Sequence, residues 1–198
     1  MKLRGFASLL RSEETAIVCA ALDHYSACTA MERHGIDNPF ASFDAGVLAR
    51  ARRLLHQAPT IRCQEPHALE EAANHASATA VMLNVAGSED AEVLERTLRN
   101  PHSRSARLGA VLAASSVLMD EPDGNRNGPL LEALGEILID SQNPYEERSA
   151  ALSAMPEATP DQSFEFVIRA TATDDPRIQA QAAMILVEEN ISLYGGLV

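Results

Sequence analysis

The sequence predicts an all-α fold in which about five helix pairs stack side by side as a solenoid. Three observations lead to this prediction. Aromatic residues make up only 4% of the 198 residues, whereas alanine and leucine are frequent, which suits close helix packing better than strands. Apolar residues recur with a helical period in several segments. Between these segments, prolines that follow a polar or acidic residue recur at the spacing of helix-pair repeats.

The N-terminal part is expected to form the first helix pair. FASLLRS is followed by EETAIVCAALDHYSACTAMERHG, with Ser12 as the cap of the second helix. Residues 36–42, IDNPFAS, then form a linker. Residues 1–42 are the least regular part of what we expect to be a single domain spanning residues 1–198.

An apolar helix is then predicted ahead of each proline-led segment. The first of these is FDAGVLARARRLL. The next three place their apolar residues on one face: Val93, Leu94 and Leu98 in DAEVLERTL, Leu130, Leu131, Leu134 and Leu138 in PLLEALGEILI, and Phe164, Val167 and Ile168 in FEFVIRA. Each unit is thus an apolar helix, a tight corner and an Ala-rich helix. Such a unit needs neighbours on both sides to bury its apolar faces.

Four segments share a polar or acidic residue, a proline and then a helix-like run: EPHALEEAA from Glu65, NPHSRSARLGAVLAA from Asn100, NPYEERSAAL from Asn143 and DPRIQAQAAM from Asp175. Their prolines, at positions 66, 101, 144 and 176, are 35, 43 and 32 residues apart. Asn or Asp at the N-cap accepts a hydrogen bond from a free amide, and Pro at the first helical position lacks an N–H that the helix would not use. Each segment is therefore expected to begin a helix. Asn143 and Glu146 also fit a capping box, and Thr159-Pro160 repeats the pattern.

At these segments the chain resembles HEAT repeats, including the HEAT-like repeats of the phycobilisome-lyase type. The family pattern is an apolar helix, an acidic or Asn residue before Pro, an Arg about four residues later and then paired alanines. NPYEERSAAL meets it best, with Arg148 at the Arg position. The other segments depart there: Ala180 in DPRIQAQAAM, Glu70 in EPHALEEAA, and Arg104 and Arg107 off by one or two places in NPHSRSARLGAV.

The resemblance covers residues 43–192 and, more weakly, the first 35 residues. It implies a right-handed α-α superhelix of about five HEAT-like helix pairs. It is specific for architecture and implies no particular activity.

The charge balance argues against a nucleic-acid partner. Lys plus Arg total 16 against 28 Asp plus Glu, a net charge of −12, whereas a protein that binds the phosphate backbone needs the opposite balance. The arginines form two local groups: Arg50, Arg52 and Arg53, and Arg96, Arg99, Arg104 and Arg107. HEAT-like DNA glycosylases are also helical arrays, which keeps DNA repair as a less favoured alternative. That resemblance implies a basic groove and aromatic platforms, yet the chain is acidic and has no Trp.

The cysteines and the N-terminus predict a cytoplasmic protein. Cys19, Cys28 and Cys63 are an odd number scattered through helical-looking sequence, which fits buried thiols in a reducing cytosol. The N-terminus shows no secretory apolar region, and no uncharged span approaches about 18 residues, so we expect no membrane association. Lys2 is the only lysine beside 15 arginines, a composition that suggests a GC-rich bacterial source.

The segment DGNRNG resembles the opening of a calcium loop. Asp123, Asn125 and Asn127 stand at alternate positions as in an EF-hand, followed by Gly128. Leu134 occupies the place where the bidentate Glu is needed. Because a turn explains the same residue types, we expect a turn and no calcium.

Two helical clusters carry possible metal ligands: His24, Cys28 and Glu32, and His67, Glu71 and His75. Their spacing puts each cluster on one helix face. A helical metal site needs three or four such groups converging in one place, and neither cluster supplies a closed set of soft ligands. We therefore expect no metal and no cofactor.

The leading functional hypothesis is a non-catalytic scaffold or adaptor whose second helices line a concave surface that grips another protein. The sequence has no Gly-rich phosphate loop, no Cys-x-x-Cys pair and no nucleophile elbow, so we do not predict an enzyme. The net charge favours a basic partner that associates more slowly as salt rises. The candidate partner-binding residues, expected to be exposed on the second helices, are Glu70, Glu71, Arg104, Arg107, Glu147, Arg148, Arg177 and Gln181.

One concrete version is a bacterial immunity or regulatory protein that caps a basic toxin or enzyme. The alternative from another class is a lyase- or chaperone-type protein that cradles a small cofactor. That alternative predicts a deep apolar pocket with Cys28 or Cys63 at its wall. The sequence does not indicate an oligomeric state.

Overall fold

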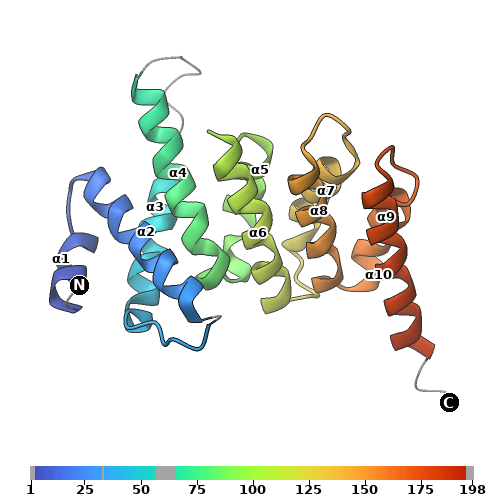
Figure 1. Cartoon of the computed structure of the whole chain (residues 1–198), viewed down its shortest axis with the longest axis horizontal. Helices are drawn as coiled ribbons and strands as arrows, with labels where there is room; N and C mark the ends of the chain where they lie inside the picture. Colours follow the sequence, from blue (N-terminus) through green and yellow to red (C-terminus); the bar gives the residue numbers. More distant parts are fainter. Residues whose placement is uncertain (1–2, 33, 57–65, 195–198) are drawn as a thin grey trace.

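The computed structural model describes residues 3–32, 34–56 and 66–194, with side chains for all of these except 66–72 and 189–194 (Figure 1). The described part has no strand and forms ten α-helices: α1 Leu3–Leu10, α2 Thr15–Glu32, α3 Asp44–His56, α4 Pro66–Val85, α5 Ala91–Arg99, α6 Arg104–Asp120, α7 Asn127–Ile139, α8 Tyr145–Ala154, α9 Pro160–Ala170 and α10 Pro176–Tyr194. Three 3-10 helices lie between them: η1 Ala41–Phe43, η2 Ser88–Asp90 and η3 Met155–Glu157. The predicted all-α fold is confirmed.

Consecutive helices pack in pairs. Helix α1 contacts α2, α3 contacts α4, α5 contacts α6, α7 contacts α8 and α9 contacts α10. Each even-numbered helix also contacts the next even-numbered one, and each odd-numbered helix contacts the next odd-numbered one. Figure 1 shows the pairs following one another along the long axis of the molecule, with α4, α6, α8 and α10 side by side. Each pair therefore covers the apolar side of its neighbour.

The apolar faces predicted for α5 and α7 are confirmed. Val93, Leu94 and Leu98 are buried in α5, and all four leucines predicted for α7 are buried. A strict helical period over a well-covered helix identifies its core face reliably.

The face predicted for α9 is wrong in part. Val167 is buried, but Phe164 and Ile168 remain 43% and 46% exposed. The buried row of α9 consists of Ser163, Val167 and Ala170, at positions i, i+4 and i+7. Phe164 and Ile168 lie on the adjacent row, where no described segment covers them fully.

Two glycines allow neighbouring pairs to approach closely. A Cβ at Gly109 of α6 would overlap the side chain of Thr79 in α4. A Cβ at Gly135 of α7 would overlap the ring of Phe166 in α9. At both places the missing side chain lets a helix lie against the next pair.

Two proline-led helix starts agree with expectation. Helix α10 begins at Pro176, and Asp175 Oδ1 accepts a hydrogen bond from Arg177 N at 2.9 Å, as an N-cap should. Helix α9 begins at Pro160 with Thr159 as its N-cap, although the Thr159 side chain makes no capping hydrogen bond. Helix α4 also begins at its proline, Pro66, but its expected cap, Glu65, lies outside the described residues.

Three predicted N-caps do not cap the first turn of their helices. Helix α6 begins at Arg104 with Ser103 as its cap, so Asn100-Pro101 precedes the helix. The capping box at Asn143 does not form, since its Nδ2 donates to Ile137 O at 3.1 Å near the end of α7. Ser12 Oγ accepts a hydrogen bond from Glu14 N at 3.1 Å, and α2 begins only at Thr15.

The N-terminal region is tied to the core through the linker. Phe6 of α1 stacks on Phe40, with ring centroids 4.4 Å apart. Asn38 is buried and donates to Thr29 Oγ1 at 3.1 Å. Tyr25 donates to Asp44 Oδ1 at 2.8 Å, and burial together with this hydrogen bond raises the pKa of Tyr25. The predicted linker is thus a packed turn that ends in η1.

In the part of the chain that the structure describes, no helix combines the length and apolar character needed to cross a bilayer.

Candidate functional site

Several charged residues that we expected to contact a partner join successive helix pairs instead. Arg107 Nη2 of α6 lies 2.6 Å from Glu147 Oε2 of α8. Arg104 reaches both Glu146 Oε2, at 3.0 Å, and Glu147 Oε1, at 3.4 Å. The expectation that Glu147 is exposed is wrong, because its side chain is fully buried under these two guanidinium groups. A buried carboxylate needs such partners to offset its lost hydration.

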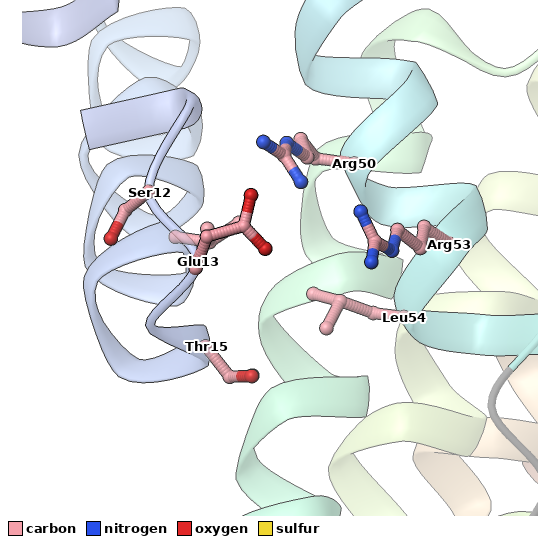
Figure 2. Close-up of a pocket in the computed structure, with 7 residues that line it drawn as sticks. Ser12, Glu13, Thr15, Arg50, Arg53 and Leu54 are labelled. Carbon is pink, nitrogen blue, oxygen red and sulfur yellow. The ribbon is translucent and has the colours of Figure 1, made fainter. Parts of the chain in front are cut away.

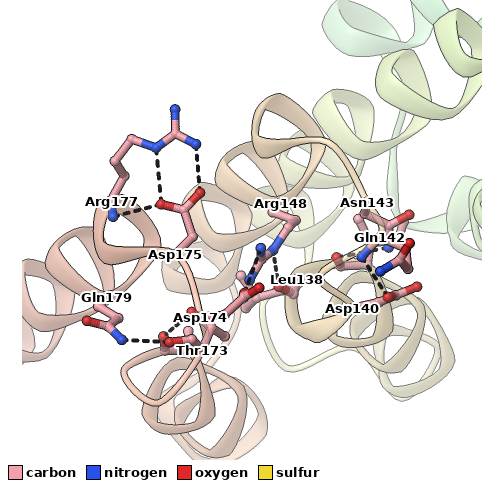
Figure 3. A network of polar contacts seen from close by, with 12 residues as sticks. Leu138, Asp140, Gln142, Asn143, Arg148, Thr173, Asp174, Asp175, Arg177 and Gln179 are labelled. Atoms are coloured by element: carbon pink, nitrogen blue, oxygen red, sulfur yellow. Dashed lines mark hydrogen bonds and ion pairs between the residues drawn. The ribbon is translucent and has the colours of Figure 1, made fainter.

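Arg148 was also expected to be exposed, and it is buried. Its Nε donates to Leu138 O at 2.9 Å, and its Nη1 lies 3.2 Å from Asp174 Oδ1 (Figure 3). One guanidinium thus connects the end of α7, the start of α8 and the turn before α10. Arg148 therefore holds the last two pairs together.

Arg177 and Gln181 link α10 to α8. The Arg177 guanidinium lies 3.8 Å from the ring centroid of Tyr145, and Gln181 Nε2 donates to Ser149 O at 3.2 Å. Arg177 also binds Asp175 with two nitrogens (Figure 3), and these hydrogen bonds lower the pKa of Asp175 to about 2. Arg177 stays largely exposed, whereas Gln181 is half-buried.

Glu70 and Glu71 lie in α4, but their side chains are outside the described part of the structure. Their role in partner binding stays a prediction.

The odd-numbered helices repeat the same scheme of ion pairs. Arg52 of α3 binds Asp90 at 2.5 Å and Glu89 at 2.7 Å, just before α5, and its hydrogen bond lowers the pKa of Glu89. Arg99 of α5 binds Glu136 of α7 at 2.5 Å. These members of the two arginine groups therefore neutralise neighbouring carboxylates and do not form a continuous basic face.

Arg50 and Arg53 line a small hollow of about 110 Å³ between the start of α2 and α3. Figure 2 shows the Glu13 carboxylate directed toward both guanidinium groups, with Ser12 and Thr15 at the edge. Because Glu13 already supplies a negative charge in this hollow, we do not assign it as a site for an external anion.

The possible metal ligands do not converge where the structure describes them. Within the described residues, no group of three His, Cys, Asp or Glu side chains is close enough to hold a metal ion. Glu32 Oε1 accepts from Asn38 N at 3.3 Å, away from the other members of its predicted cluster. His75 stacks on His102 with ring centroids 3.7 Å apart. The side chains of His67 and Glu71 lie outside the described part.

The calcium-like segment is a turn. Asn127 is buried, and its Nδ2 donates to Glu121 O at 2.6 Å. This hydrogen bond closes the turn ahead of α7.

The cysteines that the structure describes pack against other residues. Cys19 is buried and lies 3.1 Å from Asn74 Oδ1. Cys28 is half-buried, packs against the core, and its Sγ lies 3.9 Å from His24 Nε2. Cys63 lies outside the described residues, so the pocket that it was expected to line is not tested there.

The helices α4, α6, α8 and α10 each contain a long uncharged stretch, a feature that our sequence reasoning did not identify as a candidate site. The uncharged stretches are residues 76–85 in α4, 108–119 in α6, 149–156 in α8 and η3, and 178–187 in α10. Several large apolar side chains in them are exposed: Leu112 at 40%, Met119 at 61%, Met184 at 64% and Val187 at 57%. Exposed apolar residues on the same face of an array are typical of a binding surface.

These exposed positions recur from helix to helix. Leu112, Ser153 and Met184 each stand nine residues after the residue that caps their helix. All three are exposed, on helices that lie side by side in Figure 1. Met119 continues the row along α6, and Val187 continues it along α10. We call Leu112, Met119, Ser153, Met184 and Val187 the uncharged band.

An acidic residue follows the uncharged stretch of each of α6, α8 and α10. Asp120 follows Met119, Glu157 follows α8 and Glu188 follows Val187. Asp120 is the last residue of α6, and the carboxyl end of a helix also carries a partial negative charge. The surface therefore has an apolar centre and a negative border.

Comparisons of the chain with protein-family models, with curated proteins and with solved structures find no match.

Proposed function

We propose that this chain is a non-catalytic protein-interaction module, built as a single right-handed solenoid of HEAT-like helix pairs. The pairwise packing supports the proposed architecture, since each helix contacts its partner in the pair and its counterpart in the next pair. A stack of this kind leaves one face of its second helices free of packing contacts.

The uncharged band is the observation that carries the proposal. A chain with a net charge of −12 has many charged residues for its surface, yet the centre of the second-helix face carries Leu112, Met119 and Met184. An apolar centre with a polar border is the usual anatomy of a protein-binding surface. We therefore assign partner contact to this band, with Arg177 at its edge.

The negative border favours a basic partner. Asp120, Glu157 and Glu188 would attract positive side chains at the edge of the contact. A cytoplasmic immunity or regulatory protein that caps a basic toxin or enzyme is the version that fits a small acidic module best. Its association rate should fall as salt rises.

The proposal is tested by affinity capture from a bacterial lysate at low salt with three proteins. The Leu112→Glu/Met119→Glu variant places two charges in the uncharged band. The Ala49→Glu/Ala172→Glu variant makes the same charge change at exposed positions of α3 and the turn after α9. Both should keep the helical content and melting temperature of the wild type.

We expect the wild type and the Ala49→Glu/Ala172→Glu control to retain the same protein, and the Leu112→Glu/Met119→Glu variant to lose it. Equal retention by both variants would place the contact elsewhere and remove the band as the binding site.

A further inference from the structure

Helix α9 carries an exposed apolar ridge that the two preceding odd-numbered helices lack. The three helices can be compared because Leu98, Leu138 and Ala170 occupy one buried position, 40 and then 32 residues apart. The exposed positions six and two residues earlier are the ones that differ: Glu92 and Arg96 in α5, Glu132 and Glu136 in α7, but Phe164 and Ile168 in α9. The earlier helices serve as internal controls, and they show that this position in the repeat normally faces water with a charge.

A charged row runs directly beside this ridge. Asp161, Glu165 and Arg169 follow one another at i, i+4 and i+8, parallel to Phe164 and Ile168. All three are exposed and border the same shallow hollow on α9. Within the described residues, none of the three side chains takes part in an ion pair, unlike the arginines between the helix pairs.

The row is complementary to itself when one copy is turned around. In two antiparallel helices related by a two-fold axis near residue 166, Phe164 of one copy lies opposite Ile168 of the other. Arg169 then lies opposite position 163, between Asp161 and Glu165 of the other copy. The same operation therefore buries the apolar ridge and pairs each free cation with two free carboxylates.

We propose that a second copy of this chain docks on this ridge, with α9 of one copy antiparallel to α9 of the other. The equivalent ridge of α7 is not suited to such a contact, because Glu132 of one copy would lie opposite Glu136 of the other, and the two carboxylates would repel. The proposed contact uses an odd-numbered helix, so it is independent of the uncharged band on the even-numbered helices. It does not depend on the proposed function.

The contact is small, so association should be weak and visible at protein concentrations of roughly 10 to 500 µM. Sedimentation equilibrium over that range tests it with surface variants whose folding is checked by circular dichroism. Arg169→Glu leaves six carboxylates and no cation in the two facing rows. Asp161→Arg/Glu165→Arg leaves six cations and no carboxylate.

We expect each variant alone to associate at least tenfold more weakly than the wild type. An equimolar mixture of the two variants should form heterodimers at about the wild-type affinity, because opposite rows then face each other. Glu92→Arg, on the equivalent ridge of α5, is the control and should leave association unchanged. The Leu112→Glu/Met119→Glu variant should also dimerise normally. Failure of the proposal that the uncharged band binds a partner therefore does not count against this contact.

A wild type that stays monomeric throughout the range would overturn the proposal. So would an Arg169→Glu variant that associates like the wild type, or a mixture of the two charge variants that remains monomeric.

Discussion

The burial of Glu147 depends on residues that are distant from it in the sequence. In the sequence it stands in the first turn of a polar helix start, where a glutamate normally faces water. In the fold it is fully buried between Arg104 and Arg107 of the preceding pair. Its adjacent residue, Glu146, pairs with the same Arg104 but remains exposed. Variants at these two glutamates therefore measure how much burial changes the contribution of an ion pair to stability.

We expect Glu147→Ala to lower the free energy of unfolding by about 3 kcal/mol, because it leaves Arg107 partly buried without its carboxylate. Glu146→Ala should cost less than about 1 kcal/mol, since an exposed ion pair contributes little. Urea denaturation of both variants measures the difference. Equal losses for the two would show that the carboxylate of Glu147 is not enclosed as the structure has it.

Asp175 combines a helix cap with an ion pair. Hydrogen bonds from the Arg177 side chain, and then from its backbone N–H, hold the pKa of Asp175 at about 2. Since the folded pKa is lowered below the ordinary value of 3.8, this carboxylate stabilises the fold above about pH 4. That contribution is lost as the pH falls toward 2.

A carboxyl carbon NMR titration of Asp175 should therefore give a midpoint near 2 in the wild type. In Arg177→Ala the midpoint should move back toward 3.8, because the side-chain donors are gone while the backbone donor remains. A wild-type midpoint at the ordinary value, unchanged in Arg177→Ala, would contradict the arrangement at the start of α10.

At the scale of the helix, contact between pairs depends on a few small residues. Gly109 lies where α6 meets α4, and a Cβ there would overlap Thr79. Gly128, at the start of α7, has no atom within 4 Å of the place where a Cβ would stand. A Gly→Ala substitution at each of these two positions therefore separates the effect of packing on stability from the effect of helix propensity.

We expect Gly109→Ala to destabilise the protein by about 1 to 3 kcal/mol through overpacking. Gly128→Ala should be neutral or stabilising by up to about 1 kcal/mol, because alanine is the better helix former. Thermal and urea unfolding measure both effects. If Gly109→Ala proves as harmless as Gly128→Ala, α4 and α6 are not packed as closely as described.

The elements that could be predicted from the sequence are those whose signal is local. The core leucines of α7 repeat with a helical period under complete cover, and Pro160 and Pro176 mark helix starts through their own backbone chemistry. The start of α6 was misplaced because Ser103, three residues after Asn100, provides the cap. Local signals of equal quality compete there, and only the packed helix decides between them.

The candidate site could not be predicted in the same way, because it depends on contacts between pairs. Arg148 was expected to face solvent, but it is buried and binds both Leu138 O near the end of α7 and Asp174 in the turn before α10. Leu112 and Met119 were not selected, since apolar residues in an Ala-rich helix suggest core. Their seven-residue spacing, on a row apart from the buried Ala110 and Val117, was the signal available.

At the scale of the whole molecule, the ion pairs and the exposed apolar residues lie at different places. Ion pairs such as Arg52 with Asp90, Arg99 with Glu136 and Arg107 with Glu147 connect successive pairs. Exposed apolar residues gather in the uncharged band and on the ridge of α9. Several charged residues that we expected to mark a binding site thus connect successive helix pairs, whereas the exposed apolar residues take no part in these ion pairs.

The most direct test of this division is the oxidation of individual methionines by dilute peroxide, followed by peptide mass spectrometry. Met119 and Met184 are 61% and 64% exposed in the uncharged band, whereas Met82 and Met155 are fully buried between the helices. In the free protein we expect Met119 and Met184 to oxidise at least tenfold faster than the buried pair, and in the complex with the captured partner we expect them to be protected. Oxidation of Met82 and Met155 at the rate of Met119, or unchanged oxidation of Met119 and Met184 in the complex, would contradict the account.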